Sequence, residues 1–80
     1  MSPTVLRVQG LQFYFYASEE PRRHVHAKGA AGQAKIWLEP TVELAQNRGL
    51  SRRELRRALV IVQENAHVIH AAWEAFHGGR

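Results

Sequence analysis

The chain lacks cysteine, and it lacks long hydrophobic runs. None of its 80 residues is cysteine, which excludes disulfide bonds, thiol catalysis and thiolate metal sites. Its apolar runs, such as Phe13–Tyr16 and Leu59–Val62, are far shorter than the ~20 residues of a membrane-spanning helix. Residues 1–10 do not have the layout of a signal peptide. These absences predict a cytoplasmic protein without a membrane segment.

Acidic side chains are scarce, and the basic ones are unevenly placed. The 11 Lys and Arg residues exceed the 7 Asp and Glu residues, which gives a net charge of +4. Segment 48–57 alone holds five arginines and one acid, Glu54. Only Lys28 and Lys35 are lysines, and the guanidinium group of arginine favours bidentate contacts with carboxylate or phosphate. The composition therefore indicates an anionic partner.

A chain of this length forms a single domain, 1–80, with a small core. Its hydrophobic content of 45% is too high for a disordered chain. Residues 1–40 are β-rich, with a turn at Gly10 and with Pro40 ending the last strand. The segment Thr41–Gly49 fits either one short helical turn or an irregular connection. The predicted strands are Thr4–Val8, Leu11–Ala17, His24–Lys28 and Gln33–Glu39.

Residues 51–77 have the pattern of one long helix. Ser51 and Glu54 form a capping box at its start, apolar residues recur every three or four positions, and a glycine pair ends it. Such a helix would be about 40 Å long, whereas a compact chain of this size is roughly 30 Å across. The helix must therefore overhang, kink or end early. An overhang would leave Trp73 and Phe76 to be covered by another chain.

These elements predict an α+β fold, a small antiparallel sheet of three to four strands packed on one long C-terminal helix. A single helix covers only one face of the sheet. The side chains expected on the uncovered face are Arg7, Tyr14, Tyr16, His24, His26, Lys35 and Trp37. Aromatic and basic residues of this kind stack bases in proteins that read single-stranded RNA, but aromatics also form dimer contacts. Candidates for stacking or for an interface are Tyr14, Tyr16, Trp37, Trp73 and Phe76.

The start of the long helix is unusually basic. Arginines there oppose the helix macrodipole, at a cost of a few tenths to ~1 kcal/mol each, so stability alone does not select them. Together with free backbone N–H groups they favour an anion such as phosphate. The alternative is a solvated face with salt bridges to Glu43 or Glu64. The predicted anion-binding residues are Arg48, Arg52, Arg53, Arg56 and Arg57.

Two groups of histidines are candidates for chemistry. On a strand, His24 and His26 point the same way, close enough to act as acid and base on one phosphodiester or to contact a ligand. The alternative, which ranks ahead of this one, is two polar residues on an exposed strand face or packed against Tyr14 or Trp37. A metal ion bound by this pair would lack further ligands. A second group, the ridge formed by His67, His70, Glu74 and His77, has a spacing that can chelate zinc, but the same spacing is typical of the boundary of a partly covered helix. No metal or cofactor is assigned.

Several segments carry a resemblance to a known family. They are Pro3–Leu6, Phe13–Tyr16, Pro21 with His24–His26, Ala34–Pro40, Gly49–Leu55, Glu64–Asn65 and Trp73. On these segments the chain resembles a small bacterial family, domain of unknown function 4160, over nearly all of its length. Two prolines usually precede the first histidine in that family, whereas Arg22 and Arg23 do so here. The resemblance implies a small soluble bacterial protein, often encoded beside another short protein and suspected of a toxin–antitoxin role, with no established activity.

Two hypotheses follow. In the first, a small cytoplasmic module binds the RNA or DNA backbone through the helix arginines, and a toxin-type ribonuclease activity uses the histidine pair. In the second, a non-catalytic module forms a homodimer or a hetero-complex with an acidic protein partner. A histidine-based metalloenzyme ranks well behind both. Whether the chain is an enzyme stays open.

Overall fold

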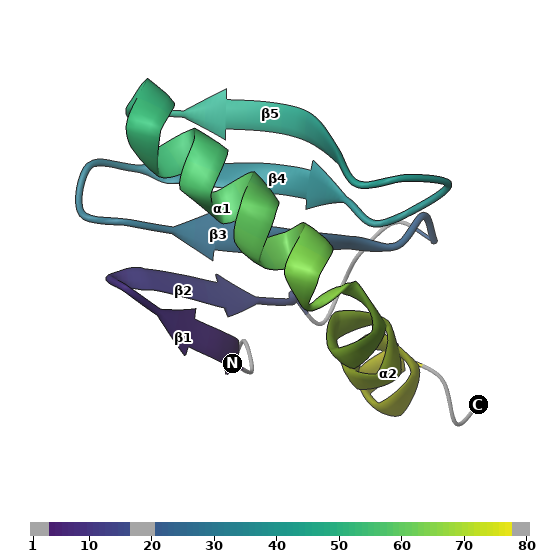
Figure 1. Ribbon diagram of the computed structural model, residues 1–80. Helices are drawn as coiled ribbons and strands as arrows, with labels where there is room; N and C mark the ends of the chain where they lie inside the picture. Colours follow the sequence, from purple (N-terminus) through teal and green to yellow (C-terminus); the bar gives the residue numbers. More distant parts are fainter. Residues whose placement is uncertain (1–3, 17–20, 78–80) are drawn as a thin grey trace.

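The computed structural model of the chain describes residues 4–16 and 21–77. Antiparallel strands form one sheet in the order of the sequence, and two helices follow them (Figure 1). The α+β class is confirmed. The elements are β1 (Thr4–Val8), β2 (Leu11–Tyr14), β3 (His24–Lys28), β4 (Gln33–Trp37), β5 (Glu43–Arg48), α1 (Arg52–Glu64) and α2 (Ala66–His77).

Four of the strands lie where the alternation of apolar and polar residues predicts them. β1 and β3 have the predicted bounds, whereas β2 ends at Tyr14 and β4 ends at Trp37, each earlier than predicted. Gln9 and Gly10 connect β1 to β2 with positive φ angles of 47° and 82°. Two such residues in sequence make the tight turn that matches the twist of a hairpin, which is why glycine suits the second position.

The fifth strand corrects the expectation of three to four strands. Segment Thr41–Gly49 contains β5, which is neither helical nor irregular and pairs with β4 from Gln33 opposite Arg48 to Trp37 opposite Glu43. The ladder is irregular between Lys35 and Ile36. All but one of the residues of β5 are exposed, as is usual for an edge strand. The pairing with β4 therefore stabilises a segment whose own sequence does not alternate.

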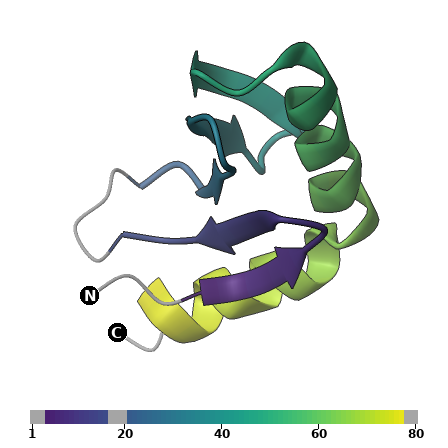
Figure 2. The same ribbon diagram turned by 90° about the vertical axis from the view of Figure 1, so that its left-hand side faces the viewer.

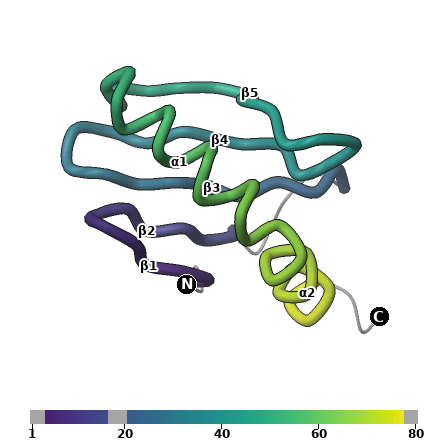
Figure 3. Tube along the Cα trace, viewed as in Figure 1, coloured from purple at the N-terminus to yellow at the C-terminus, as the bar shows by residue number. Residues whose placement is uncertain are grey.

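The expectation of one long helix is also wrong, because the chain turns at Asn65 (Figure 3). The backbone N–H of Asn65 donates to the carbonyl oxygens of Ile61 and Val62, and its side-chain Nδ2 donates to that of Ile61 over 2.8 Å. A continuous helix would be about 40 Å long, more than the 37 Å of the longest molecular axis. α2 instead packs against the end of the sheet where β1 begins, β2 ends and β3 begins (Figures 1 and 2).

The turn at Asn65 changes the surroundings of Trp73 and Phe76. Trp73 is only 7% exposed and contacts the ring of Phe15, and Phe76 is partly buried against the same phenyl group. The chain's own sheet therefore covers the two residues that an overhanging helix would have left for another chain. The glycine pair at 78 and 79 lies outside the described residues.

The core lies between the sheet and the helices. Figure 2 shows α1 on one side of the sheet, and neither of the two described helices lies across the opposite side. The capping box at the start of α1 is confirmed, since Ser51 Oγ accepts from the Glu54 N–H over 3.1 Å and Glu54 Oε1 accepts from the Ser51 N–H over 3.3 Å. The buried core cluster consists of Leu11, Phe13, Phe15, Val25, Ala27, Ile36, Leu38, Ala58, Ile61, Val62, Ile69 and Trp73.

Candidate functional site

The register of the strands sets three rows of side chains on the sheet face away from α1. Because opposite residues in neighbouring strands share a face, each row can be followed from strand to strand. We call these residues the open face. The first row is Arg7, Gln12, Lys28, Gln33 and Arg48; the second is Tyr14, His26, Lys35 and Gln46; the third is His24, Trp37 and Glu43.

The open face is rich in positive charge. Its basic residues are Arg7, Lys28, Lys35 and Arg48, and Glu43 is the acid that the register places among them within the described part of the chain. In the first row a cation lies on every second strand and a glutamine lies between. Since neighbouring strands are about 4.8 Å apart, the cations of this row repeat roughly every 10 Å. The face thus presents a regular array of positive charge.

Trp37 adds a further cation to this surface. The guanidinium carbon of Arg22 lies 4.0 Å from the centre of the indole ring, and Lys35 Nζ lies 4.6 Å from it. Both distances fit cation–π contacts. Arg22 is also held by its Nε, which donates to the carbonyl oxygen of Glu39 over 3.0 Å. Trp37 therefore gathers two cations at one end of the open face, and its ring is engaged by them.

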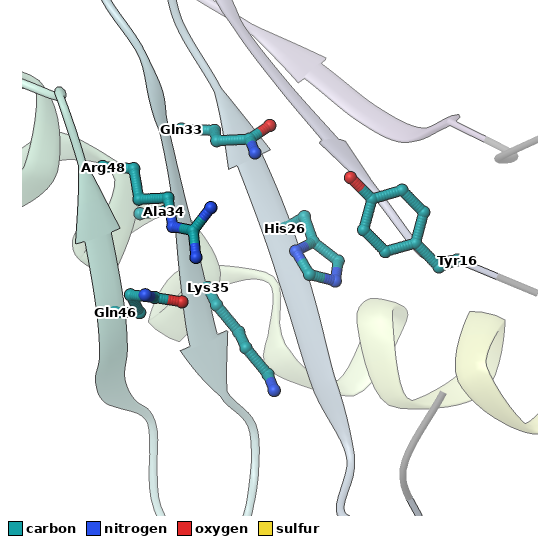
Figure 4. A pocket seen from close by; sticks show the side chains of 7 residues that line it. All are labelled: Tyr16, His26, Gln33, Ala34, Lys35, Gln46 and Arg48. Atoms are coloured by element: carbon teal, nitrogen blue, oxygen red, sulfur yellow. The ribbon is translucent and has the colours of Figure 1, made fainter. Parts of the chain in front are cut away.

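A cavity of about 290 Å³ lies in the middle of the open face (Figure 4). Figure 4 shows the side chains that line it, with the helices behind the sheet. Tyr16 follows β2, and the other lining residues belong to β3, β4 and β5. Its volume is just below the range of about 300 to 1,000 Å³ that small-molecule sites have. The lining residues are Tyr16, His26, Gln33, Ala34, Lys35, Gln46 and Arg48.

The buried Tyr14 orients one of the lining groups. Its hydroxyl donates to Gln33 Oε1 over 2.9 Å, and its ring stacks on that of His26 at 5.5 Å. Burial, and secondly the neighbouring Tyr16, raises the pKa of Tyr14 above its ordinary value. Tyr14 therefore stays a phenol near neutral pH, which keeps it a hydrogen-bond donor and excludes it as a base.

Close backbone contacts fix the segment that carries Arg48, which is one of the residues that line the cavity. A Cβ atom on Gly32 would lie 2.1 Å from the carbonyl oxygen of Arg48, so only glycine permits this approach of the two backbones. The side chain of Asn47 donates to the carbonyl oxygen of Leu50 and accepts from the Leu50 N–H, both over 3.0 Å. The backbone that carries Arg48 is thereby tied to the start of α1.

The two histidines of the predicted catalytic pair have different surroundings. Their rings lie 5.3 Å apart, as the strand spacing predicts. His24 has no exposed surface, its Nδ1 donates to the carbonyl oxygen of Arg22 over 2.6 Å, and its ring packs against Trp37 and Trp73. His26 is partly exposed and lines the cavity. In this conformation only His26 can reach a substrate.

The arginines at the start of α1 lie on the other side of the sheet. Arg52, Arg53 and Arg56 are exposed, and none of them forms an ion pair within the described residues, so the salt bridges to Glu43 or Glu64 that the alternative interpretation requires are not made there. Arg57 is partly buried, and its Nη2 donates to the carbonyl oxygen of Gln9 over 3.0 Å. Among the predicted anion-binding residues, the structure brings Arg48 to the open face and separates it from the helix arginines.

The histidine ridge of α2 takes part in contacts within the fold. Arg23 donates to His70 Nδ1 over 3.1 Å and forms an ion pair with Glu74, while His70 Nε2 donates to the carbonyl oxygen of Leu38 over 3.3 Å. Within residues 4–16 and 21–77, no three potential metal-binding side chains are grouped closely enough to hold an ion. Of the four ridge residues, His70 and Glu74 thus contribute contacts within the fold, whereas His67 is exposed.

Sequence reasoning missed the glutamines of the open face. Gln33 lies two residues before Lys35 on a strand whose start the sequence predicts correctly, so alternation could have placed it there. Gln46 comes from β5, which the sequence does not predict, so it had no such signal. The pairing of β5 with β4 is what brings Gln46 and Arg48 to the cavity.

Comparison with known proteins identifies the family of the chain. The searches of curated proteins and of solved structures gave no significant match. Neither described helix has the length and apolar character needed to cross a membrane. The family described as Domain of unknown function (DUF4160) matches residues 10–74. Because this match covers most of the chain, the protein belongs to the DUF4160 family.

Proposed function

We propose that this chain binds nucleic acid, and that the open face contacts the phosphate backbone of a single strand. The observation that carries the proposal is the row of Arg7, Lys28 and Arg48 on the sheet face away from α1. Cations that contact phosphates release counterions and supply most of the sequence-independent affinity for nucleic acids. A sheet with exposed aromatic and basic side chains is also a common platform for single strands.

The shape of the charge array supports this partner. The cations of the first row cross the sheet at intervals of roughly 10 Å, and Arg22 and Lys35 flank Trp37 at one end. A flexible polyanion can adjust to such an array, whereas one ion could satisfy only part of it. The proposed role is therefore binding along a chain of phosphates.

The experiment compares the two basic surfaces at equal charge. One variant carries Arg7→Gln, Lys28→Gln and Arg48→Gln, and the matched control carries Arg52→Gln, Arg53→Gln and Arg56→Gln. Each loses three charges from a net charge of +4, so both have +1. Fluorescence anisotropy with labelled single-stranded oligonucleotides at low salt should show a loss of about tenfold or more for the first variant and a small effect for the second. Equal losses, or a larger loss in the control, would contradict binding on the open face.

Ribonuclease chemistry of toxin type remains a proposal within this function. His26 lines the cavity, but the buried His24 does not contact the surface, so an acid and base pair would need a change of conformation. Cleavage of a labelled RNA by the native protein, lost in His26→Gln, is the expected result if the proposal holds. Intact RNA after prolonged incubation with bound protein would contradict the ribonuclease activity but not the proposed binding.

A second candidate function is the binding of an acidic protein through α1. Arg52, Arg53 and Arg56 are exposed and unpaired within the described residues, at a helix end where the macrodipole disfavours positive charge. Val60 on the same helix is 45% exposed. This candidate predicts that a poly-glutamate peptide binds the native chain and the open-face variant but not the α1 variant. Light scattering at high protein concentration tests the homodimer, and a monomer there would argue against self-association.

A further inference from the structure

The cavity on the open face presents polar groups that the fold itself does not use. Gln33 Oε1 accepts from Tyr14, and Gln33 Nε2 donates to no partner among the described residues. Gln46 and Arg48 are exposed, and their side chains likewise make no hydrogen bond or ion pair within residues 4–16 and 21–77. Figure 4 shows Gln46 and Arg48 on one side of the cavity and the ring of Tyr16 on the other, with His26 between them and Gln33 at the upper end. The rings of Tyr16 and His26 lie 4.4 Å apart.

The orientation of the Gln33 amide is determined by the tyrosine beneath it. Tyr14 is buried, and its raised pKa keeps its hydroxyl protonated, so it donates to the amide oxygen. The amide nitrogen of Gln33 can then donate a hydrogen bond to a ligand. A carboxamide held in one orientation by a buried partner can distinguish an acceptor from a donor on that ligand.

We propose that this cavity is a subsite for one unstacked base of the bound strand. Tyr16 contacts the face of the base, Gln33 and Gln46 hydrogen-bond to its edge, and Arg48 binds the adjoining phosphate. The inference rests on the proposed function, because it names how one nucleotide of that strand is held.

The chemistry of the lining selects a base over other ligands. Carboxamide side chains match the neighbouring donors and acceptors on base edges, and aromatic side chains stack on bases. None of the lining residues is a carboxylate, which disfavours a metal ion or a cationic ligand. The volume of about 290 Å³ suits a single planar group and not an extended ligand.

The test separates contacts with the base from contacts with the backbone. Labelled single strands of equal length, as RNA, as DNA and as DNA with abasic residues, are titrated against the native protein by fluorescence anisotropy. The subsite predicts that an intact strand binds about tenfold more tightly than its abasic counterpart. Tyr16→Ala should remove most of that advantage without weakening the abasic strand.

Two further variants test the role of the amide. Tyr14→Phe leaves the charge of the protein unchanged but removes the hydroxyl that orients Gln33, so it should reduce the differences in affinity between the four bases. Gln33→Ala should do the same, and circular dichroism shows whether each variant is folded. Gln12→Ala is the matched control, since Gln12 lies in the same row but does not line the cavity. Because Gln12 belongs to the open face, its loss can alter the overall affinity for a strand, but the differences in affinity between the four bases should match those of the native protein.

The outcomes are distinguishable from failure of the proposed function. If intact and abasic strands bind equally, the backbone proposal stands and the base subsite is wrong. The subsite is also wrong if Gln33→Ala and Gln12→Ala change base preference equally. If no strand of any kind binds, the proposed function fails, and the subsite fails with it.

Discussion

His24 and His26 show how two residues of one kind, two positions apart on a strand, acquire different roles. Both lie on the face away from α1, where the alternation of a strand places them. α2 passes the end of the sheet beside His24, so Trp73 contacts its ring and the residue has no exposed surface. His26 lies further along β3 and remains partly exposed. Contact with α2, which is distant in the sequence, therefore buries His24 and leaves His26 partly exposed.

This difference predicts unequal effects of substitution on stability. His24→Ala should lower the free energy of unfolding by about 2 to 4 kcal/mol, because it leaves a cavity in the core and removes the hydrogen bond to the Arg22 carbonyl oxygen. His26→Ala should cost less than about 1 kcal/mol, because the residue is partly exposed. Urea denaturation of both variants measures the two values. A His24→Ala protein as stable as the native one would contradict the buried environment.

Tyr14 makes stability depend on pH in the alkaline range. Its pKa is higher in the folded chain than in the unfolded chain, where it is near 10. Above about pH 10 the unfolded chain therefore releases the phenolic proton while the folded chain retains it. The stabilisation that the raised pKa of Tyr14 provides is fully present below about pH 10 and is lost as the pH rises further.

The corresponding prediction compares the native protein with Tyr14→Phe. Between about pH 9 and pH 11 the native protein should lose more stability than the variant, with an added slope of up to about 1.4 kcal/mol per pH unit. Urea midpoints at each pH provide the measurement. Parallel pH profiles for the two proteins would show that Tyr14 titrates normally.

At the scale of elements, the two ends of α1 are determined in different ways. Its start is set by Ser51 and Glu54, whose reciprocal hydrogen bonds involve residues three positions apart. Its end at Asn65 contains neither proline nor glycine. The helix stops there because α2 can bury Ile69 and Trp73 only if the chain changes direction.

The capping box provides a prediction at this scale. Ser51→Ala should destabilise the protein by about 1 kcal/mol, because the Glu54 N–H loses its acceptor. Glu54→Gln is the matched control, since glutamine can still accept from the Ser51 N–H and should cost less. Thermal unfolding of both variants checks the order of the two effects. Equal losses would indicate that the charge of Glu54, and not its hydrogen bond, matters at this end.

At the scale of the whole molecule, the sheet separates two positive surfaces. The open face carries its cations in rows set by strand pairing, and α1 carries its arginines on the side of the helices. A molecule of net charge +4 can thus present one surface to a polyanion and another to a second acidic partner. The two proposed functions use different surfaces and are compatible in one protein.

The salt dependence of binding tests the use of the open face. Each phosphate contact with a single strand contributes about −0.7 to the slope of log affinity against log salt concentration. Removal of the charges of Arg7, Lys28 and Arg48 should therefore make the slope shallower by about 2. Titrations at several salt concentrations measure this change. An unaltered slope would mean that these residues do not contact phosphates.

The sequence by itself determined the features that depend on neighbouring residues. The bounds of β1 and β3, the start of α1 and the concentration of arginines follow from alternation, capping and composition. These depend on hydrogen bonds and periodicities that span a few positions, so the local pattern is sufficient.

The tertiary structure alone decided the fifth strand, the turn at Asn65, the burial of His24 and the cavity. Each results from contacts between segments far apart in the chain, as where β5 pairs with β4 or Trp73 meets His24. No local pattern reports such contacts, because their free energy is gained only when the whole chain packs. For the same reason the sequence placed Arg7 and Lys35 on one face of the sheet, whereas only the fold added Lys28 and Arg48 to that face and separated Arg48 from the arginines of α1.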